Sequence, residues 1–322
     1  MEQSDSRVVT VTMNPALDIA TSARAVHTTD KVRCVAPRRD PGGGGLNVAR
    51  VLRVLGGDVM AVFPSGGHCG LAVEDLLIGE QVRHWAEPVS GSTRESFTVD
   101  DESTGEQYRF VLPGPILTVA EVESCLARVR EFAVDSGYVV VSGSLPPGVG
   151  ADFVQRLVDY LEGTGARLVV DTSGAALRAL KSGVFLVKPS IRELREWVDH
   201  PLETRVEQVD AARTIVAQKV AEVVVVSLGA AGALLVTADM CECVPSVDVV
   251  SISGVGAGDS MVAGMVYSLI HQRSLMDAVR FGVAAGAAML KTPGTAPCLP
   301  ADVEVFYERI RAGADRGVIR PD

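Results

Sequence analysis

The feature that most limits how this chain can fold is one pattern that recurs along it. A continuous run of apolar residues, rich in Val and Leu, ends in a loop of small or polar residues, and a helical segment follows. The pattern occurs at residues 7–13, 59–67, 138–148, 166–174, 183–190 and 221–229. Apolar strands that alternate with helices are typical of a mostly parallel sheet covered by helices on both faces. Ligands bind at the carboxyl ends of such strands, so we expect the site in these loops.

Two segments lack this pattern, at about residues 19–40 and 92–114. Both alternate polar and apolar residues, which predicts short, half-exposed antiparallel strands. We expect the two segments to form one small sheet that stands off the core as a lid or a dimer surface. No linker or internal repeat divides the sequence, so residues 1–322 are predicted to form a single α/β domain with this lid inserted.

Charge and composition argue against several classes of protein. The net charge of −10 argues against nucleic acid as a partner, because phosphate backbones bind basic surfaces. No apolar run is long enough to span a membrane, and the first residues lack the layout of a secretory signal, so we expect a cytoplasmic protein. The five His residues are isolated and suggest no metal cluster. Cys241 and Cys243 form a C-x-C pair that we expect in a strand rather than at a metal.

Four consecutive glycines, at residues 42–45, precede a helical stretch that contains Asn47. A flexible turn would explain them, although a turn needs only one or two glycines and each further one costs backbone entropy. The alternative is a close approach of the backbone to a ligand, with Asn47 facing that ligand from the first helical turn. The motif G-x-x-x-x-G-K-S/T does not occur, so the loop is not a P-loop.

A second glycine loop, GVGAGD at residues 254–259, leads into an apolar helical stretch. Amides at a helix N-terminus form an anion site where small residues leave them open, and Gly256, Ala257 and Gly258 would supply them. Asp259 then falls in the first helical turn, either as a helix cap or dipole partner, or as a base toward a hydroxyl that attacks a phosphate. A dinucleotide-binding loop would stand early in the chain and place a third glycine where Asp259 is, which disfavours an oxidoreductase.

Taken together, these motifs resemble the ribokinase-like, or PfkB, sugar kinase family over roughly residues 7–312. The resemblance rests, in chain order, on TMNPALD, GGGGLNVAR, GEQYRFVLPG, SGSLPPG, VVSLGAAGALL and GVGAGDSMVAG. KVRC, DPGGGGLNVAR and TRESF make the chain most similar to the bacterial minor type of 6-phosphofructokinase within that family. The resemblance implies a three-layer ribokinase-like core with a mostly parallel sheet and a small β-sheet lid.

The resemblance also implies roles for individual residues. Asp259 would be the general base toward the 1-hydroxyl of a sugar, and the amides of Gly256, Ala257 and Gly258 would form an anion hole. Lys31 would bridge the two substrates. The residues implied in binding the sugar phosphate are Asp18, Gly42, Gly43, Asn47, Arg94, Ser144 and Arg33, of which the last would reach across a dimer interface. From the residues alone, Asp18 could equally form a turn, and the basic residues of the lid could be solvated surface charges.

For the nucleotide, the resemblance implies Lys188, Ser190, Ser227, Gly229, Gly232 and Gly258. From the residues alone, the stretch that begins at Ser227 could be an ordinary β-turn. ATP would carry Mg²⁺, which Glu193 would hold through water. A K⁺ site built from backbone carbonyls would involve Ser253, Val255, Met289, Thr292, Gly294 and Ala296.

One position departs from the family's pattern. Ser190 stands where the family has an Asn, three residues before Glu193. In the family, that Asn and the Glu help to organise Mg²⁺ and the phosphates through water, and a Ser side chain is shorter than an Asn. We expect weaker or altered handling of Mg²⁺ and nucleotide rather than loss of activity, because the base and the anion hole are intact.

The resemblance therefore implies an ATP-dependent kinase that phosphorylates fructose 6-phosphate at the 1-hydroxyl, giving fructose 1,6-bisphosphate and ADP. A tagatose-6-phosphate kinase or a 1-phosphofructokinase would use the same machinery. A regulator that binds sugar phosphate and nucleotide without turnover is a remoter alternative, and Ser190 alone supports it. Apolar positions on the short lid strands, among them Phe97 and Phe110, predict a homodimer formed through the lid.

Overall fold

The structure is a computed structural model that describes residues 6–28 and 31–315 of the chain. Within this part, nine strands form one sheet in the order β13-β12-β11-β10-β9-β8-β1-β4-β5. Their bounds are β1 (Arg7–Val11), β4 (Asp58–Ser65), β5 (His84–Pro88), β8 (Tyr138–Ser142), β9 (Arg167–Asp171), β10 (Val184–Val187), β11 (Ala221–Ser227), β12 (Ala233–Val236) and β13 (Cys241–Val244). Strands β11 to β5 pair in parallel, and β12 and β13 add antiparallel pairs at one edge. The predicted mostly parallel sheet is therefore confirmed.

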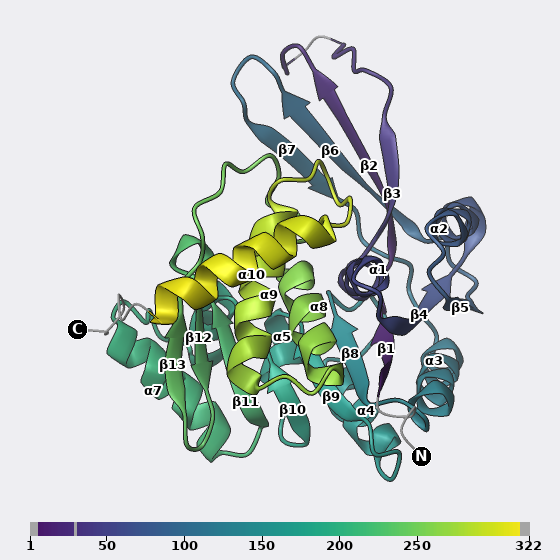
Figure 1. The fold of residues 1–322 in the computed structure, drawn as a ribbon. Helices are drawn as coiled ribbons and strands as arrows, with labels where there is room; N and C mark the ends of the chain where they lie inside the picture. Colours follow the sequence, from purple (N-terminus) through teal and green to yellow (C-terminus); the bar gives the residue numbers. More distant parts are fainter. Residues whose placement is uncertain (1–5, 29–30, 316–322) are drawn as a thin grey trace.

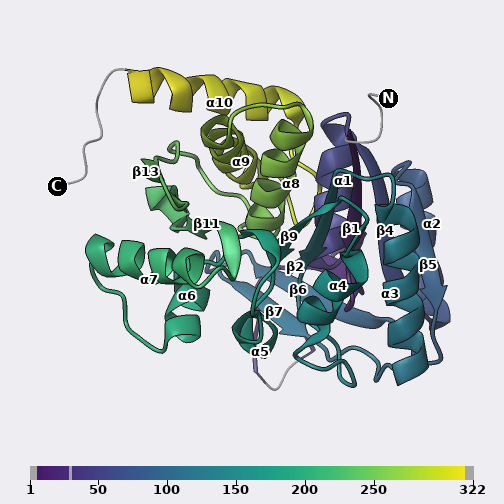
Figure 2. The ribbon, with the colours of Figure 1, turned by 90° about the horizontal axis from the view of Figure 1, so that it is seen from below.

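Helices cover both faces of this sheet, which gives the predicted three layers (Figure 1, Figure 2). One face carries α1 (Gly44–Val54), α2 (Gly67–Gly79), α8 (Ala257–Ile270), α9 (Leu275–Met289) and α10 (Pro300–Asp315). The other carries α3 (Val119–Ala133), α4 (Phe153–Leu161), α5 (Gly174–Arg178), α6 (Ile191–Val198) and α7 (Arg205–Ala217). Successive strand residues face opposite layers, as Val140 and Val141 do. Burial on both faces explains why the strands are continuously apolar.

The two segments predicted to form the lid do form one small sheet, which stands off the core (Figure 1). Its strands are β2 (Ala16–Ala23), β3 (Arg38–Gly42), β6 (Arg94–Asp101) and β7 (Gln107–Val111), in the order β3-β2-β6-β7. Asp18 lies inside β2 and pairs with Asp40 of β3, so it does not form a turn. The lid thus begins a few residues earlier than about residue 19.

The prediction that the lid strands are all antiparallel is wrong at the centre of this sheet. β2 and β3, and also β6 and β7, are antiparallel, but β2 and β6 run parallel over eight residue pairs. The reason is the direction in which the chain enters the lid. β2 follows β1 and β6 follows β5, and both of these core strands point the same way in the parallel sheet. Their continuations therefore leave the core side by side in the same direction.

Three further observations concern the described residues. No helix among them is long and apolar enough to cross a membrane. No group of three or more His, Cys, Asp or Glu side chains in 6–28 and 31–315 is arranged to hold a metal ion. Cys241 and Cys243 lie in β13, as expected. That residues 1–322 form a single domain stays a prediction, because residues 1–5, 29–30 and 316–322 lie outside the described part.

Helices α8 and α9 approach each other closely because glycines face each other between them. A Cβ atom at Gly282 would lie 2.5 Å from Met265 Cγ and 2.7 Å from the Met261 carbonyl oxygen. One at Gly264 would lie 2.9 Å from Ala285 Cβ. These distances are shorter than van der Waals contact, so neither glycine can carry a side chain without a shift. The packing matters for function because α8 begins at the second glycine loop.

Gly282→Ala is expected to lower the free energy of unfolding by about 1–3 kcal/mol, since overpacking outweighs the better helix propensity of Ala. Gly79→Ala is the matched control: it lies in α2, and a Cβ there meets nothing within 4 Å. We expect the control to be neutral or stabilising. Urea denaturation measures both, and a Gly282→Ala protein as stable as the parent would contradict the close packing.

Candidate active site

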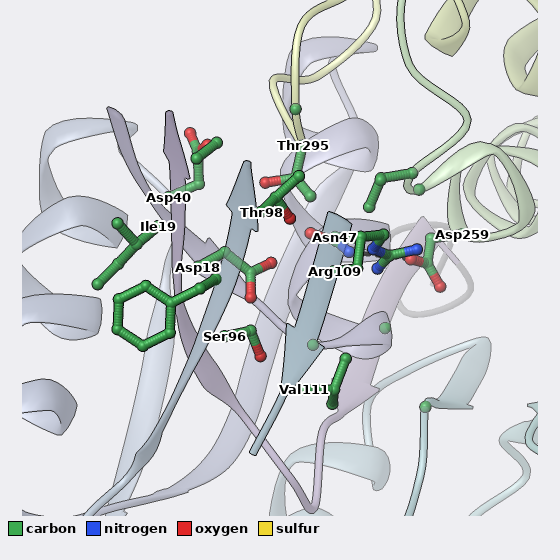
Figure 3. A pocket seen from close by; sticks show the side chains of 18 of the residues that line it. Asp18, Ile19, Asp40, Asn47, Ser96, Thr98, Arg109, Val111, Asp259 and Thr295 are labelled. Atoms are coloured by element: carbon green, nitrogen blue, oxygen red, sulfur yellow. Dashed lines mark hydrogen bonds between the residues drawn. The ribbon is translucent and has the colours of Figure 1, made fainter. Parts of the chain in front are cut away.

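The main candidate site is a cavity of about 300 Å³ between the carboxyl ends of the core strands, the start of α8 and the lid (Figure 3). Lid strands supply Asp18, Ile19, Ala20, Asp40, Arg94, Ser96, Phe97, Thr98, Arg109 and Val111. Core loops and helix starts supply Gly43, Gly44, Asn47, Gly143, Gly254, Val255, Gly256, Asp259, Gly294 and Thr295. Both predicted glycine loops therefore meet at one cavity, although 210 residues separate Asn47 from Ala257 in the chain.

Asp259 lies in the first turn of α8, which begins at Ala257 and has Gly256 as its N-cap. Gly256 adopts the left-handed conformation, with φ of 79°, that a residue with a side chain rarely adopts. The Asp259 carboxylate accepts hydrogen bonds from Asn47 Nδ2 and from Ser142 Oγ, each at 2.9 Å. Both donors belong to other elements, α1 and the end of β8. The carboxylate therefore links three segments and makes no side-chain cap for its own helix.

Burial is the main reason why the pKa of Asp259 rises, to about 7. The nearby Asp171 carboxylate raises it further, whereas the hydrogen bonds from Asn47 and Ser142 and the charge of Lys188 lower it. A carboxyl group with such a pKa exchanges a proton near neutral pH. Perturbed groups of this kind in a cavity are typical of general acids and bases.

The four consecutive glycines are required by close contacts, so a flexible turn does not explain them. A side chain at Gly42 would overlap the carboxyl group of Asp18, and one at Gly44 would overlap Ser142 Oγ. Gly43 has a φ of 112°, in the region that favours glycine. The loop thus lets the backbone pass beneath Asp18 and deliver Asn47 to Asp259.

Asp18 faces the cavity from the lid, opposite Asp259 (Figure 3). Burial raises its pKa to about 6, while the positive charge of Arg94 acts against burial. Arg94 donates to the backbone carbonyls of Asn14, at 3.1 and 3.3 Å, and of Leu112, at 3.2 Å. The side chain of Asn14 donates to Ser144 Oγ at 3.2 Å. Asn14 thus brings Arg94 and Ser144, both predicted for the sugar phosphate, close to each other.

Lys31 and Arg33 do not line this cavity. Both are exposed and lie with Arg24 and His27 along a second hollow of about 690 Å³ at the far end of the lid. Residues 29 and 30, just before Lys31, are outside the described part of the chain. The roles of Lys31 and Arg33 at the substrates stay predictions, and for Arg33 the prediction already required a second subunit.

The residues predicted for the nucleotide lie at the neighbouring carboxyl ends of β10 and β11. Ser190 and Ser227 form a β-bridge, and a 3-10 turn from Gly229 to Ala231 leads into Gly232. Lys188 is buried and pairs with Asp171 at 3.1 Å. Burial lowers the pKa of Lys188, but the carboxylates of Asp171, Glu193 and Asp259 together outweigh burial, so the pKa is raised.

Gly258 connects this second group to the cavity. A Cβ atom at Gly258 would lie 3.5 Å from Lys188 Nζ, so the start of α8 separates the buried Lys188–Asp171 pair from the sugar side. The order of groups across the site is therefore Asp18, Asp259, the α8 N-terminus and Lys188. This order fits two ligands that meet at the helix N-terminus, where backbone amides favour an anion.

Ser190 has a specific local role in the structure. Its hydroxyl accepts from the Glu193 backbone amide at 3.2 Å, and its own amide donates to Glu193 Oε2 at 2.8 Å. The two residues thus form a capping box at the start of α6. The Glu193 side chain stays mostly buried, at 16% exposed, and keeps oxygen lone pairs that could accept from metal-bound water.

The residues predicted for K⁺ belong to two segments that lie side by side. The amide of Ile252 donates to the Leu290 carbonyl at 2.7 Å, which joins the segment before α8 to the end of α9. The Thr292 hydroxyl lies 2.8 Å from the Met289 carbonyl oxygen and 2.9 Å from that of Ala296. These hydrogen bonds hold the two segments together, and the K⁺ site itself stays a prediction.

Sequence reasoning missed several polar residues of the site, among them Ser142, Asp171, Asp40 and Arg109. Ser142 and Asp171 end strands β8 and β9, where a polar residue after an apolar run was the available signal. Arg109 stands within GEQYRFVLPG, a stretch singled out as a motif, and points from β7 toward the side of the cavity that holds Asn47 and Asp259 (Figure 3). Asp40 gave no signal apart from its place just before the four glycines.

Comparisons with known proteins place the chain among carbohydrate kinases. The profile described as "pfkB family carbohydrate kinase" matches residues 11–302. The chain is 52% identical over 307 residues to the ATP-dependent 6-phosphofructokinase isozyme 2 of Mycobacterium tuberculosis, covering 95% of this chain and 91% of that protein. It is 42% identical over 304 residues to the protein of the same name from Escherichia coli, covering 94% and 98%. A 1-phosphofructokinase of Haloferax volcanii is 33% identical over 294 residues, covering 89% and 92%.

Solved structures of phosphofructokinase-2 from Escherichia coli are similar over the whole described fold. The complex with potassium matches with a TM-score of 0.91 at 41% identity, covering 95% of this chain and 99% of that one. The complex with fructose-6-phosphate matches with a TM-score of 0.89 at 40% identity, and a tetrameric inhibited form with 0.89 at 41%, with the same coverage. From its motifs, its fold and these matches, the chain belongs to the pfkB family of carbohydrate kinases.

Proposed function

We propose that the protein transfers the γ-phosphoryl group of ATP to the 1-hydroxyl of fructose 6-phosphate, giving fructose 1,6-bisphosphate and ADP. The observation that carries the proposal is the half-buried Asp259 carboxylate, which faces the cavity from the first turn of a helix whose N-terminus has no side-chain cap. Two relatives at 52% and 42% identity bear the name ATP-dependent 6-phosphofructokinase isozyme 2, which supports both the reaction and the substrate.

In the proposed reaction, Asp259 accepts the proton of the sugar's 1-hydroxyl while the oxygen of that hydroxyl attacks the γ-phosphorus of ATP. The bond to the new phosphate ester forms, the bond to the leaving oxygen of ADP breaks, and the proton stays on Asp259. Amides of Gly256, Ala257 and Gly258 stabilise the charge on the moving phosphoryl group. Lys188 adds positive charge on the nucleotide side. Mg²⁺, when bound with ATP, would neutralise phosphate charge, and Glu193 would hold its water.

On the sugar side, Asp18 is proposed to accept hydrogen bonds from sugar hydroxyls, and Arg94, Arg109 and Ser144 to bind the 6-phosphate. Guanidinium groups bind phosphate with two parallel hydrogen bonds, which suits Arg94 and Arg109 to this task. Kinases of tagatose 6-phosphate or fructose 1-phosphate would use the same groups. The higher identity to proteins named 6-phosphofructokinase favours fructose 6-phosphate over these alternatives.

Ser190 is proposed to modify nucleotide handling without abolishing turnover. Its hydroxyl serves the capping box with Glu193, so it supplies no side-chain amide toward Mg²⁺ or phosphate. We therefore expect weaker or altered binding of Mg²⁺ and nucleotide, while the rest of the site still supports turnover. A binding protein without turnover is disfavoured, because the group that such a protein would be expected to lose, Asp259, is in place with both of its donors.

We also propose that the protein works as a homodimer formed through the lid, in the cytoplasm. Phe97 is 37% exposed, Phe110 56% and Val111 62%, and all three are on the lid. Large apolar side chains on a thin sheet of four strands gain stability when a second surface covers them. Pairing of two lids would also explain why Arg33 lies far from its own subunit's cavity.

The enzymatic proposal is tested by ADP release in the presence of fructose 6-phosphate. Asp259→Asn should lower kcat by about 10²–10⁴-fold, because the base is lost while the shape of the site is kept. Asp277→Asn is the matched control, since Asp277 occupies the same helical position in α9 and does not line the cavity. Parent activity no greater than that of Asp259→Asn would refute the enzyme. Faster turnover of tagatose 6-phosphate or fructose 1-phosphate would refute the proposed substrate.

The pH dependence of kcat/KM should report the raised pKa of Asp259. The base works as the carboxylate, so activity should fall about tenfold per pH unit below a pKa of about 7. Ser142→Ala removes a hydrogen bond that lowers this pKa, so its acidic limb should lie at higher pH than that of the parent. Substrate phosphates titrate equally with both proteins, which makes the difference between them diagnostic. A limb that moves to lower pH in Ser142→Ala would contradict the assignment.

The lid interface is tested by gel filtration at micromolar concentration. Phe110→Asp should convert the parent dimer to a monomer, because a charge would have to be buried at the interface. Ile78→Asp is the control: Ile78 is 64% exposed on α2, which is not a strand of the lid sheet, and its change should leave the dimer intact. A monomeric parent, or a Phe110→Asp protein that elutes with the parent, would rule out this interface.

A further inference from the structure

Arg50 is a charged side chain in the interior of the protein, with 1% of its surface exposed. It lies on α1, one turn after Asn47, which donates to Asp259. Burying a guanidinium costs free energy that an apolar side chain of similar volume would not, so packing alone does not require an arginine here. The partners of Arg50 therefore need an explanation.

The guanidinium of Arg50 joins three segments of the chain. Nε and Nη2 donate to the two carboxylate oxygens of Glu80, each at 2.6 Å, just after α2 ends. Nη1 donates to the backbone carbonyls of Thr295, at 2.8 Å, and of Pro41, at 3.3 Å. Nη2 also lies 3.6 Å from Asp40 Oδ1. The segment that contains Thr295 is thereby fastened to β3 of the lid.

Two of these partners form part of the cavity wall. Asp40 and Thr295 both line the cavity. Asp40 lies directly opposite Asp18 in the register of strands β3 and β2 (Figure 3). Arg38 closes the contact from the other side, with an ion pair of 2.6 Å to Asp40 and a guanidinium that lies against Gly294. The position of this wall relative to Asp18 thus depends on two arginines, Arg50 and Arg38, that do not themselves line the cavity.

We infer that Arg50 is a positioning residue for the sugar half of the cavity, because it holds the Thr295 carbonyl against the lid strand that ends at Gly42. The inference rests on the proposed function and adds a residue to it. Loss of the contact should loosen the wall near Asp18 and weaken sugar-phosphate binding. Apart from Gly258, the groups proposed for ATP lie at or just after the carboxyl ends of β10 and β11 and should keep their places.

The electrostatic effect of Arg50 can be separated from its geometry. Burial raises the pKa of Asp18, and the charges of Arg94 and Arg50 act against that rise. Arg50→Lys keeps the positive charge but loses the planar group that binds Glu80 through two bonds and Thr295 through a third. The substitution therefore tests the geometry of the wall while the field at Asp18 is largely preserved.

Arg53 provides a matched control on the same helix. It also ties α1 to the segment after α2, since Nε donates to the Gln81 carbonyl at 3.0 Å and Nη2 to Gln81 Oε1 at 3.1 Å. No described interaction joins Arg53 to Gly294 or Thr295, the part of the cavity wall that Arg50 holds, and Arg53 does not line the cavity. A purely structural link between α1 and α2 would be weakened equally by Arg53→Lys.

The experiment compares the parent, Arg50→Lys and Arg53→Lys in steady-state kinetics with fructose 6-phosphate and ATP. Arg50→Lys should raise the KM for fructose 6-phosphate by about tenfold, the effect expected when the displaced wall costs the bound sugar phosphate about one charge-assisted hydrogen bond. We expect its KM for ATP to stay within about twofold, and Arg53→Lys to match the parent in both. Calorimetric binding of fructose 6-phosphate without ATP should show the same tenfold difference in Kd.

An unchanged KM for fructose 6-phosphate, an equal rise in both KM values, or the same change in Arg53→Lys would overturn the inference. If Arg50→Lys does not fold, Glu80→Gln decides, because it weakens the anchor and keeps Arg50. Its KM for fructose 6-phosphate should rise about threefold with that for ATP unchanged, and no rise would overturn the inference. Turnover by the parent and by Arg53→Lys checks the proposed function separately, since that function can stand while the role of Arg50 fails.

Discussion

The site depends on one interaction: the half-buried carboxylate of Asp259 accepts hydrogen bonds from both Asn47 and Ser142. These side chains come from α8, α1 and the end of β8, so their hydrogen bonds fix the relative positions of three elements. Burial alone would leave Asp259 protonated, whereas hydrogen bonds to a charged group typically contribute about 1.5–3 kcal/mol each and favour the carboxylate. The balance sets a pKa of about 7, at which the group can both accept and release a proton near neutral pH.

Gly42, Gly44 and the buried Arg50 help to position the elements around this interaction. Gly42 and Gly44 allow the chain to pass under Asp18 and beside Ser142, so that α1 starts close enough for Asn47 to reach Asp259. One turn further along the same helix, Arg50 ties the opposite wall of the cavity to the lid. Helix α1 thus carries a donor to the proposed base and an anchor for the proposed sugar site on successive turns.

Much of the core and of the catalytic centre could be predicted from the sequence, because those signals are local. Val-rich runs buried on both faces indicate a parallel sheet, and a glycine loop before an apolar helix indicates both the anion site and Asp259. The parallel pairing of β2 with β6 could not be predicted, since it depends on where distant strands leave the core. The partners of Arg50 and the contact between Asp259 and Ser142 likewise arise only from folding. The sequence identifies these residues but does not show which side chains they contact in the folded protein.

The central claim is that Asp259 is a carboxyl group poised near neutral pH by burial and by two specific donors. The most direct measurement is a pH titration of ¹³C-labelled Asp side chains by NMR, with Asp259→Asn used to assign the resonance. The account predicts a resonance, absent from Asp259→Asn, that titrates with a midpoint near pH 7. A midpoint close to the ordinary Asp value of about 3.9 would contradict it.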